Sequence, residues 1–266
     1  MRPQDCYPKA RAAATRAIEI ESKLAEPHTS MGFIALLYDW DMAAAEKHFL
    51  RSLELNSQYA PAHHWYSDFL AANGRLAESW DQAQRAHELD PLGLIINWNL
   101  GWILYFSRRY DEAIVQFHNT LELDPNYLVA YMFLGQAYVQ KQRYDHAQEA
   151  FQRAIDLSHG AAVSHALLGH CQAIAGRTDH ALQILAELEE RSKQSYISPA
   201  FFAWIHLGLG DHDKTFAWLE KASEEHSNWL AWLNSDPRFD PLRPDPRFAN
   251  LLRRVGFVRN QPVEST

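Results

Sequence analysis

The chain has 266 residues, of which 47% are hydrophobic and 22% charged, and its formal net charge is −8. An acidic balance opposes a broad phosphate-binding surface, so nucleic acid is not an expected partner. Only Cys6 and Cys171 are present, far apart in the sequence, which excludes a disulfide framework and indicates a reducing, cytoplasmic location. The strongest candidate for a membrane span, Leu94–Phe106, is too short and contains two asparagines, so no membrane association is expected.

The first predicted helix is ARAAATRAIEIESKL, Ala10 to Leu24. Its small and apolar residues, such as Ala17 and Ile18, are spaced as in the second helix of a helical hairpin, yet there is no room before it for a first helix. We therefore interpret residues 1–24 as the orphan second helix of a truncated repeat. Its open apolar face predicts either a preceding first helix encoded upstream of Met1 or self-association through this N-terminal edge.

The central part of the sequence repeats itself. The segment LELDPNY, residues 121–127, matches HELDPLG, residues 87–93, which lies 34 residues earlier. Repeat starts near residues 60, 94, 128, 162 and 196 keep this period, and an earlier repeat from residue 25 fits with one extra residue in its turn, YDWDM. This pattern predicts six helix–turn–helix repeats over residues 25–228.

Small residues recur at the eighth position of each repeat. A glycine within a helix costs about 1 kcal/mol relative to alanine, so its recurrence indicates that two helices cross closely there. Large residues at the twenty-fourth position are expected to fill the adjoining layer. The small residues are Gly32, Ser67, Gly101, Gly135, Gly169 and Ala203, and the large ones are Phe49, Phe117, Phe151 and Leu185.

This register resembles the tetratricopeptide repeat (TPR) family. The resemblance implies an all-α fold, a right-handed superhelical solenoid of antiparallel helix pairs. The match is best in the third and fourth repeats. Gln172 and His206 stand where the family prefers an aromatic residue, and His159, Lys193 and Ser227 replace its proline, which marks the last two repeats as the less regular ones.

The C-terminal part, residues 229–266, is predicted to be a cap and tail. Asp245 followed by Pro246 is a strong helix start, because the aspartate can cap the helix and proline suits its first turn. The helical spacing of Phe248, Leu251, Leu252 and Val255 places these residues on one apolar face, with Gly256 as a plausible stop. We expect a capping helix that covers the last repeat.

Motifs for catalysis are missing from the sequence. There is no glycine-rich phosphate loop, no nucleophile elbow and no HExxH pair. His165 and His170 are five residues apart and so do not share a helix face, and Cys171 fits a packing role. We therefore expect no enzyme activity, no cofactor and no metal site.

The predicted first helices carry almost no positive charge; Lys141, at the end of the fourth one, is the exception. The resemblance implies that first helices line the concave side, where relatives that bind the acidic tails of chaperones use Lys, Arg and Asn. That partner class is not expected here. The corresponding positions hold His64, Trp98, Met132 and Ala166, then Asp68, Trp102, Gln136 and His170.

An aromatic stripe remains as the candidate binding site. Trp98, Trp102 and Tyr105 lie at i, i+4 and i+7 of one helix, with Phe106 beside them. Trp65 and Trp204 could extend this lining into neighbouring repeats. We interpret the six residues as a partner-binding groove, while packing between repeats is the alternative role for each of them.

The sequence therefore favours a non-enzymatic scaffold that binds a peptide or helix of an unidentified protein partner in an uncharged aromatic concave groove. The alternative is a regulatory or sensor portion of a larger bacterial signalling protein. The segments YDWDMAAAEKHFLRSLELN and DPRFDPLRPDPRF resemble bacterial repeat segments found C-terminal to winged-helix regulators, protein kinases or nucleotide cyclases. Fold alone does not choose between the two.

Overall fold

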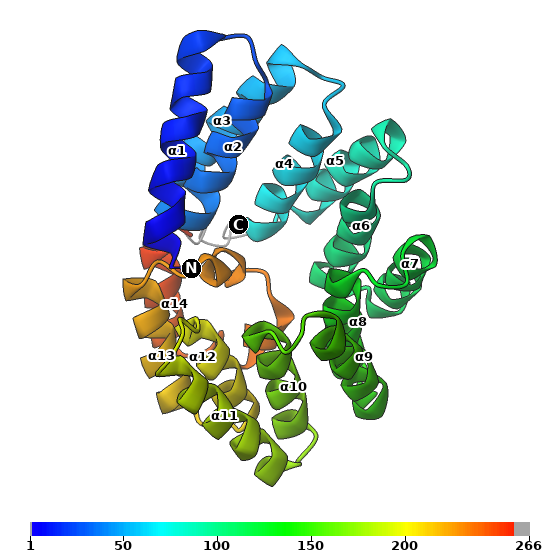
Figure 1. The fold of residues 1–266 in the computed structure, drawn as a ribbon, viewed down its shortest axis with the longest axis vertical. Helices are drawn as coiled ribbons and strands as arrows, with labels where there is room; N and C mark the ends of the chain where they lie inside the picture. Colours follow the sequence, from blue (N-terminus) through cyan, green and yellow to red (C-terminus); the bar gives the residue numbers. More distant parts are fainter. Residues whose placement is uncertain (1, 258–266) are drawn as a thin grey trace, which may run out of the picture.

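The computed structural model describes residues 2–257, so Met1 and the predicted tail, residues 258–266, lie outside the described residues. Over this range the fold is all-helical, as predicted (Figure 1). A single helix, α1 (Pro3–Ile20), precedes six antiparallel pairs. The pairs are α2 (Glu26–Ile34) with α3 (Met42–Leu55), α4 (Ala60–Ala72) with α5 (Leu76–Leu89), α6 (Leu94–Phe106) with α7 (Tyr110–Leu123), α8 (Leu128–Gln140) with α9 (Tyr144–Leu157), α10 (Ala162–Ile174) with α11 (Thr178–Ser192), and α12 (Pro199–Gly208) with α13 (His212–Glu224).

The pairs stack side by side into a superhelix, which confirms the predicted solenoid of TPR type. In three of the six pairs the glycine of the first helix faces the phenylalanine of the second. A Cβ atom added at Gly101 would lie 2.7 Å from the ring of Phe117, and one at Gly135 would lie 2.5 Å from the ring of Phe151. The recurring glycines therefore allow an aromatic ring to lie directly on the neighbouring backbone.

The extra residue of the first repeat is taken up by a π-turn. Helix α2 continues into a π-turn at Ala35–Asp39, and Trp40 then adopts a left-handed conformation with φ 56°. An inserted residue widens a helical turn in this way without breaking the hydrogen-bonded backbone. The turn places Trp40 at the edge of the solenoid.

Helix α1 begins at Pro3, seven residues before the expected start at Ala10, because Pro3 occupies the first turn and Pro8 is accommodated within the helix. Ala14 is buried, and the ring of Tyr7 stacks on Tyr38 at 5.0 Å. The far end of the helix is less covered. The side chain of Ile20 is 71% exposed.

The sixth repeat departs from the regular stacking, as the sequence indicated. Helix α12 packs against its partner α13 and against α10 of the preceding repeat, and it touches α11 only slightly. A Cβ atom at Gly208 would lie 2.8 Å from that of Ala173, and one at Gly169 would lie 2.9 Å from Ile205. Helix α11 carries Leu185 where three other repeats carry phenylalanine, and the side chain of Ile205, together with that of Ile184, fills the space over Gly169.

The C-terminal part does more than cap the last repeat. Two short 3-10 helices, η2 (Asn228–Trp232) and η3 (Pro237–Leu242), cross the middle of the superhelix and lead to α14 (Pro246–Arg254), as Figure 1 shows in orange and red. The capping face of α14 is buried as predicted, and Asp245 accepts the hydrogen bond of the Arg247 N–H. Ion pairs of Arg247 with Asp213 and of Arg254 with Glu220 tie α14 to α13.

The last repeat and the first repeat meet, so the solenoid closes into a ring. The imidazole of His226 stacks on Trp40 at 4.8 Å, and its Nδ1 atom lies 3.1 Å from the carbonyl of Tyr38. Gly256 has φ +84°, and a Cβ atom there would collide with the carbonyl oxygen of Trp40. Both the left-handed conformation and the close approach require glycine at this position.

We expect Gly135→Ala to destabilise the protein. Helix propensity alone would raise the free energy of unfolding by about 1 kcal/mol, whereas overpacking against Phe151 should lower it by about 1–3 kcal/mol. Urea denaturation measures whether the free energy of unfolding rises or falls. The same substitution in a Phe151→Leu background should cost less than in the wild-type background, and a stabilised single variant would refute the close-packing explanation.

Candidate functional site

The inner face of the ring is lined by the first helices, and its aromatic stripe is buried. Trp102, predicted to contact a partner, is only 2% exposed, and Tyr105 is completely buried. Of the six residues predicted to form the groove, only Trp65 remains partly exposed. The buried five are Trp98, Trp102, Tyr105, Phe106 and Trp204.

Residues 228–242, here named the crossing segment, run across the middle of the ring (Figure 1) and contact Trp102, Phe106 and Trp204. The indole of Trp232 lies edge-on to Trp102 at 4.9 Å, and that of Trp229 lies edge-on to Trp204 at 5.2 Å. The apolar residues of the segment belong to the same continuous core as those of the repeats. A partner could reach this part of the inner face only if the crossing segment left it.

Polar contacts fix the crossing segment at the C-terminal ends of two first helices. The hydroxyl of Ser235 donates to the carbonyl of Ala71 at 2.5 Å, and the amide of Asn234 donates to that of Ala72 at 3.2 Å. The guanidinium of Arg108 donates to the carbonyl of Ser235 at 2.7 Å and pairs with Asp240 at 2.9 Å. The segment thus binds carbonyl groups at the end of α4, of which that of Ala71 also accepts the N–H of Gly74.

A buried ion pair lies at the centre of this contact. The guanidinium of Arg238 meets the carboxylate of Asp236 at 2.5 Å, and both side chains are almost fully buried. The same guanidinium lies 4.1 Å from the centroid of the Trp204 ring, which favours a cation over its face. The inner face, predicted from the first helices to be uncharged, therefore contains a charge pair supplied by the crossing segment.

Titratable groups of the first helices are also buried here. Burial lowers the pKa of His64 to about 3 and that of His170 to about 4, with the positive charge of Arg238 adding to the effect on His170. Burial raises the pKa of Asp68 well above its usual range, although Asn99 donates a hydrogen bond to this carboxyl group at 2.5 Å. Both histidines are therefore neutral in the folded protein at neutral pH.

We expect Asp236→Asn to be strongly destabilising, because it leaves the buried guanidinium of Arg238 without its counter-charge. Breaking one partner of a buried pair costs about 3–5 kcal/mol. The exposed pair of Arg16 and Glu19 supplies a control, since Glu19→Gln should change the free energy of unfolding by less than about 1 kcal/mol. Equal effects of the two substitutions in chemical denaturation would contradict the buried location.

Stability should fall as the pH drops from about 6.5 towards 4. In that window the unfolded chain protonates its histidines, whereas the folded chain keeps His64 and His170 neutral. Each such histidine contributes a slope of up to about 1.4 kcal/mol per pH unit, and the raised pKa of Asp68 acts in the opposite direction.

The test compares His170→Gln with His180→Gln, which alters an exposed histidine. We expect the first variant to show a shallower loss of unfolding free energy between pH 7 and about pH 4. The second should follow the wild type. Identical slopes for all three proteins would show that the burial of His170 has no such effect.

Trp65, the partly exposed residue of the predicted groove, lines an open apolar pocket of about 340 Å³ at the first-repeat end of the ring. Its indole lies 4.3 Å from the ring of Phe33. Tyr7 and Cys6 of α1 close the other side. We name this pocket the end groove; its remaining lining residues are Ala10, Glu26, Thr29, Ser30, Ile34 and Tyr59.

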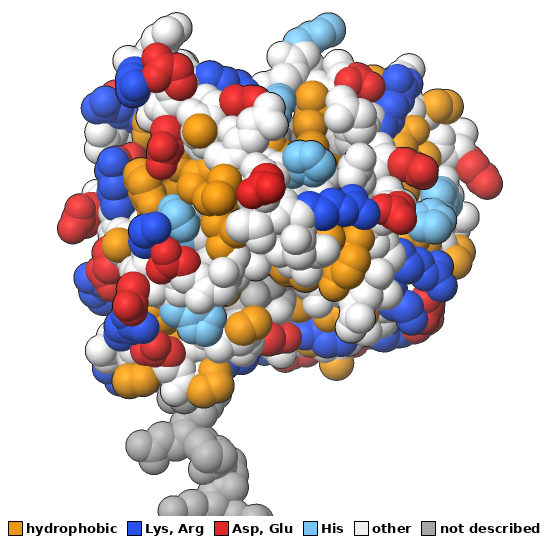
Figure 2. All heavy atoms as spheres, turned by 90° about the horizontal axis from the view of Figure 1, so that it is seen from below, with side chains coloured by type: hydrophobic (Ala, Val, Ile, Leu, Met, Phe, Trp, Pro, Cys, Tyr) orange, Lys and Arg blue, Asp and Glu red, His pale blue; other side chains and the backbone are white. Residues whose placement is uncertain are grey.

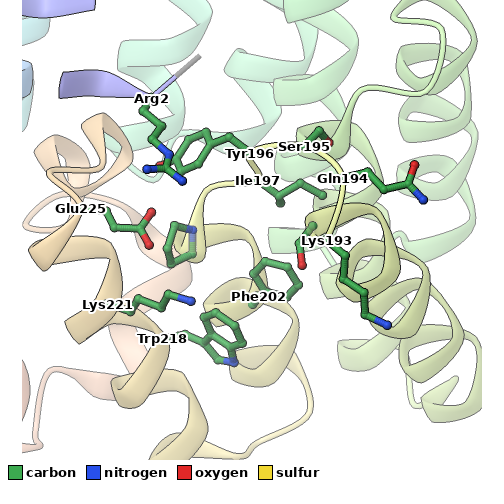
Figure 3. A pocket seen from close by; sticks show the side chains of 12 residues that line it. Arg2, Lys193, Gln194, Ser195, Tyr196, Ile197, Phe202, Trp218, Lys221 and Glu225 are labelled. Atoms are coloured by element: carbon green, nitrogen blue, oxygen red, sulfur yellow. The ribbon is translucent and has the colours of Figure 1, made fainter. Parts of the chain in front are cut away.

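A second pocket, of about 400 Å³, was not foreseen from the sequence. It lies between α13 and the link that joins α11 to α12 (Figure 3). Phe202 and Trp218 stack at 4.4 Å along one wall. The replacement of the usual proline by Lys193 was the available signal, because it marked this link as irregular.

The rest of the described chain offers little for catalysis. Residues 2–257 contain no group of three or more His, Cys, Asp or Glu side chains placed to hold a metal ion, and no helix among them is long and apolar enough for a membrane span. Cys171 is fully buried, and burial raises its pKa to about 12, so it is a poor nucleophile. On the face seen in Figure 2, basic side chains are interspersed with acidic ones rather than gathered.

The comparisons with known proteins agree with this architecture. A family model described as tetratricopeptide repeat matches residues 107–171. No curated protein matches the sequence. Among solved structures, PilW, described as a widely conserved type IV pilus biogenesis factor, has a TM-score of 0.60 at 20% identity, over 72% of this chain and 89% of that one.

Two further structures extend the comparison. PilF of Pseudomonas aeruginosa has a TM-score of 0.54 at 18% identity, over 72% of this chain and 87% of its own. The Cut9–Hcn1 complex of the APC/C matches 94% of this chain but 46% of the other, with a TM-score of 0.63 at 18% identity. At such identities these similarities concern the fold.

Proposed function

Because the helix pairs stack as in tetratricopeptide-repeat proteins and that family's model matches residues 107–171, we propose that the chain is a non-enzymatic interaction scaffold that binds a helix of a protein partner in the end groove. The observation that carries this proposal is the groove itself, an open apolar pocket at an accessible part of the concave side. Trp65 and Phe33 are its aromatic anchors. The buried part of the inner face is already occupied by the crossing segment.

Repeat packing supports a helix as the bound element. First helices inside the ring pack against the first helices on both sides, as α4 does against α2 and α6. Helix α2 packs between α1 and α4, and the end groove lies over it, bordered by Tyr7 of α1 and Trp65 of α4. A helix laid in the groove would contact all three helices, and its apolar face would cover Phe33 and Trp65.

The chemistry of the end groove selects an apolar face. Glu26 is the one charged side chain among its lining residues, and the others are aromatic, aliphatic or neutral polar. Binding energy should come from burying aromatic anchors, at about 25 cal/mol per Å² of apolar surface. Affinity should depend only weakly on salt, because screening weakens charged interfaces and not apolar ones.

We place this interaction in a reducing compartment such as the cytoplasm. Cys6 and Cys171 are both free thiols, and they belong to different helices, α1 and α10. Protein of an oxidising compartment more often pairs its cysteines.

A second candidate is the regulatory portion of a larger signalling protein. The end groove favours this too, because a helix that precedes α1 in a longer chain would occupy the same place in cis. The two candidates differ in one respect. A helix attached in cis would block a partner added in trans, so a longer form of the protein should bind that partner less tightly than residues 1–266 do.

We expect Trp65→Ala to weaken partner binding by about 2 kcal/mol or more, roughly 30-fold, because it removes an aromatic anchor. The partner is first identified by affinity capture from source lysate and mass spectrometry, and is then purified for calorimetric titration. Melting temperatures should change little, since Trp65 is only partly buried.

The matched control is Trp80→Ala, which removes a partly buried tryptophan of α5 outside the groove. This variant should bind like the wild type. Equal affinity of the Trp65 and wild-type proteins would refute the end groove as the binding site. A dimer of the wild type that Trp65→Ala dissociates would instead identify a second copy of the chain as the occupant.

A further inference from the structure

The floor of the end groove presents a charge and an aromatic anchor at a fixed spacing. Helix α2 contributes Glu26, Thr29, Ser30 and Phe33 to the lining, and their spacing of i, i+3, i+4 and i+7 places them on one face of the helix. Seven helical residues rise by about 10 Å, so Glu26 and Phe33 are about that far apart along the axis. The ring of Trp65 packs on Phe33 at 4.3 Å and enlarges the aromatic anchor.

Three polar side chains of the lining already have hydrogen-bond partners within the protein. The hydroxyl of Thr29 lies 2.7 Å from that of Ser52, and the hydroxyl of Ser30 donates to a backbone carbonyl one turn earlier at 3.2 Å. The thiol of Cys6 donates to a carbonyl of its own helix at 3.4 Å. These three side chains therefore need no hydrogen bond from a ligand.

The carboxylate of Glu26 is in a different situation. Glu26 is exposed and forms no ion pair within residues 2–257. It lies near Tyr59, another lining residue, whose pKa is raised by burial and by the negative charge of Glu26. The lining contains no lysine or arginine to offset this charge. A ligand that covers the groove removes water from the carboxylate, which is costly unless the ligand supplies a positive charge.

Resting on the proposed function, we propose that the end groove selects a partner helix with a lysine or arginine seven residues after a large apolar side chain. The apolar side chain packs on the rings of Phe33 and Trp65, and the cation pairs with Glu26. The spacing matches because a helix that lies along α2 has the same rise per residue. Such a helix runs antiparallel to α2, and a cation near its C-terminal end is also favoured by its own dipole.

Glu26 has a second role that involves no partner. It lies in the first turn of α2, where a negative charge stabilises the helix. Asp179 offers a matched control for that role, because it lies in the first turn of α11, is exposed and forms no ion pair in the described part of the chain. Asp179 does not line the end groove.

The test uses two fluorescein-labelled, alanine-based helical peptides that carry leucines and one phenylalanine on a single face. One has lysine seven residues after the phenylalanine, and the other has glutamate there. Fluorescence anisotropy with the full chain should show that the lysine peptide binds about fivefold more tightly. Glu26→Lys should invert this preference, which a difference in peptide helicity cannot do, whereas Asp179→Lys should preserve it.

Thermal unfolding checks that both variants fold, as expected for changes at exposed residues. Equal binding of the two peptides to the wild type, an unchanged preference in Glu26→Lys, or the same inversion in Asp179→Lys would overturn the proposal. If Trp65→Ala then weakens both peptides, the end groove still binds helices, but without selecting their charge. Failure of both peptides to bind the wild type would overturn the charge selection and the end groove together.

Discussion

In several repeats an aromatic ring of the second helix lies directly on the backbone of the first. The ring of Phe151 leaves no room for a side chain at Gly135, and Phe117 does the same at Gly101. This contact sets how closely the two helices of a pair approach, and that distance sets how the next pair stacks. The curvature of the ring depends on it.

Curvature creates an inner face that is too apolar to remain in water. The first helices carry tryptophan, tyrosine and phenylalanine inward, and the crossing segment covers them with Trp229 and Trp232. Its polar side chains donate hydrogen bonds to the carbonyl groups of Ala71 and Ala72 at the end of α4. The proposed binding site, the end groove, therefore lies away from this covered part of the inner face, at the first repeat.

The repeated features of the fold could be predicted from the sequence, because the residues that pack within each helix pair recur at a fixed spacing. The period, the small residues and the capping face of α14 with Asp245 and Gly256 were all readable. The path of the crossing segment was not, since Ser235 and Ala71 are 164 residues apart and no periodic signal links them. The contact of α12 with α10 depends on Ile205 filling the space over Gly169. The spacing of residues in the sequence does not show which neighbouring side chain fills that space.

Closure of the ring changes how such a chain reaches its fold. An open array of repeats folds outward from any nucleus and frays from its ends, because each unit needs only its neighbours. Here His226 contacts Tyr38, which lies 188 residues earlier in the sequence. Closing the ring therefore brings together distant parts of the polypeptide. Loop-closure entropy opposes that step, and contacts of high sequence separation slow folding. Once the first and last repeats are in contact, neither of them is a free end from which unfolding can start.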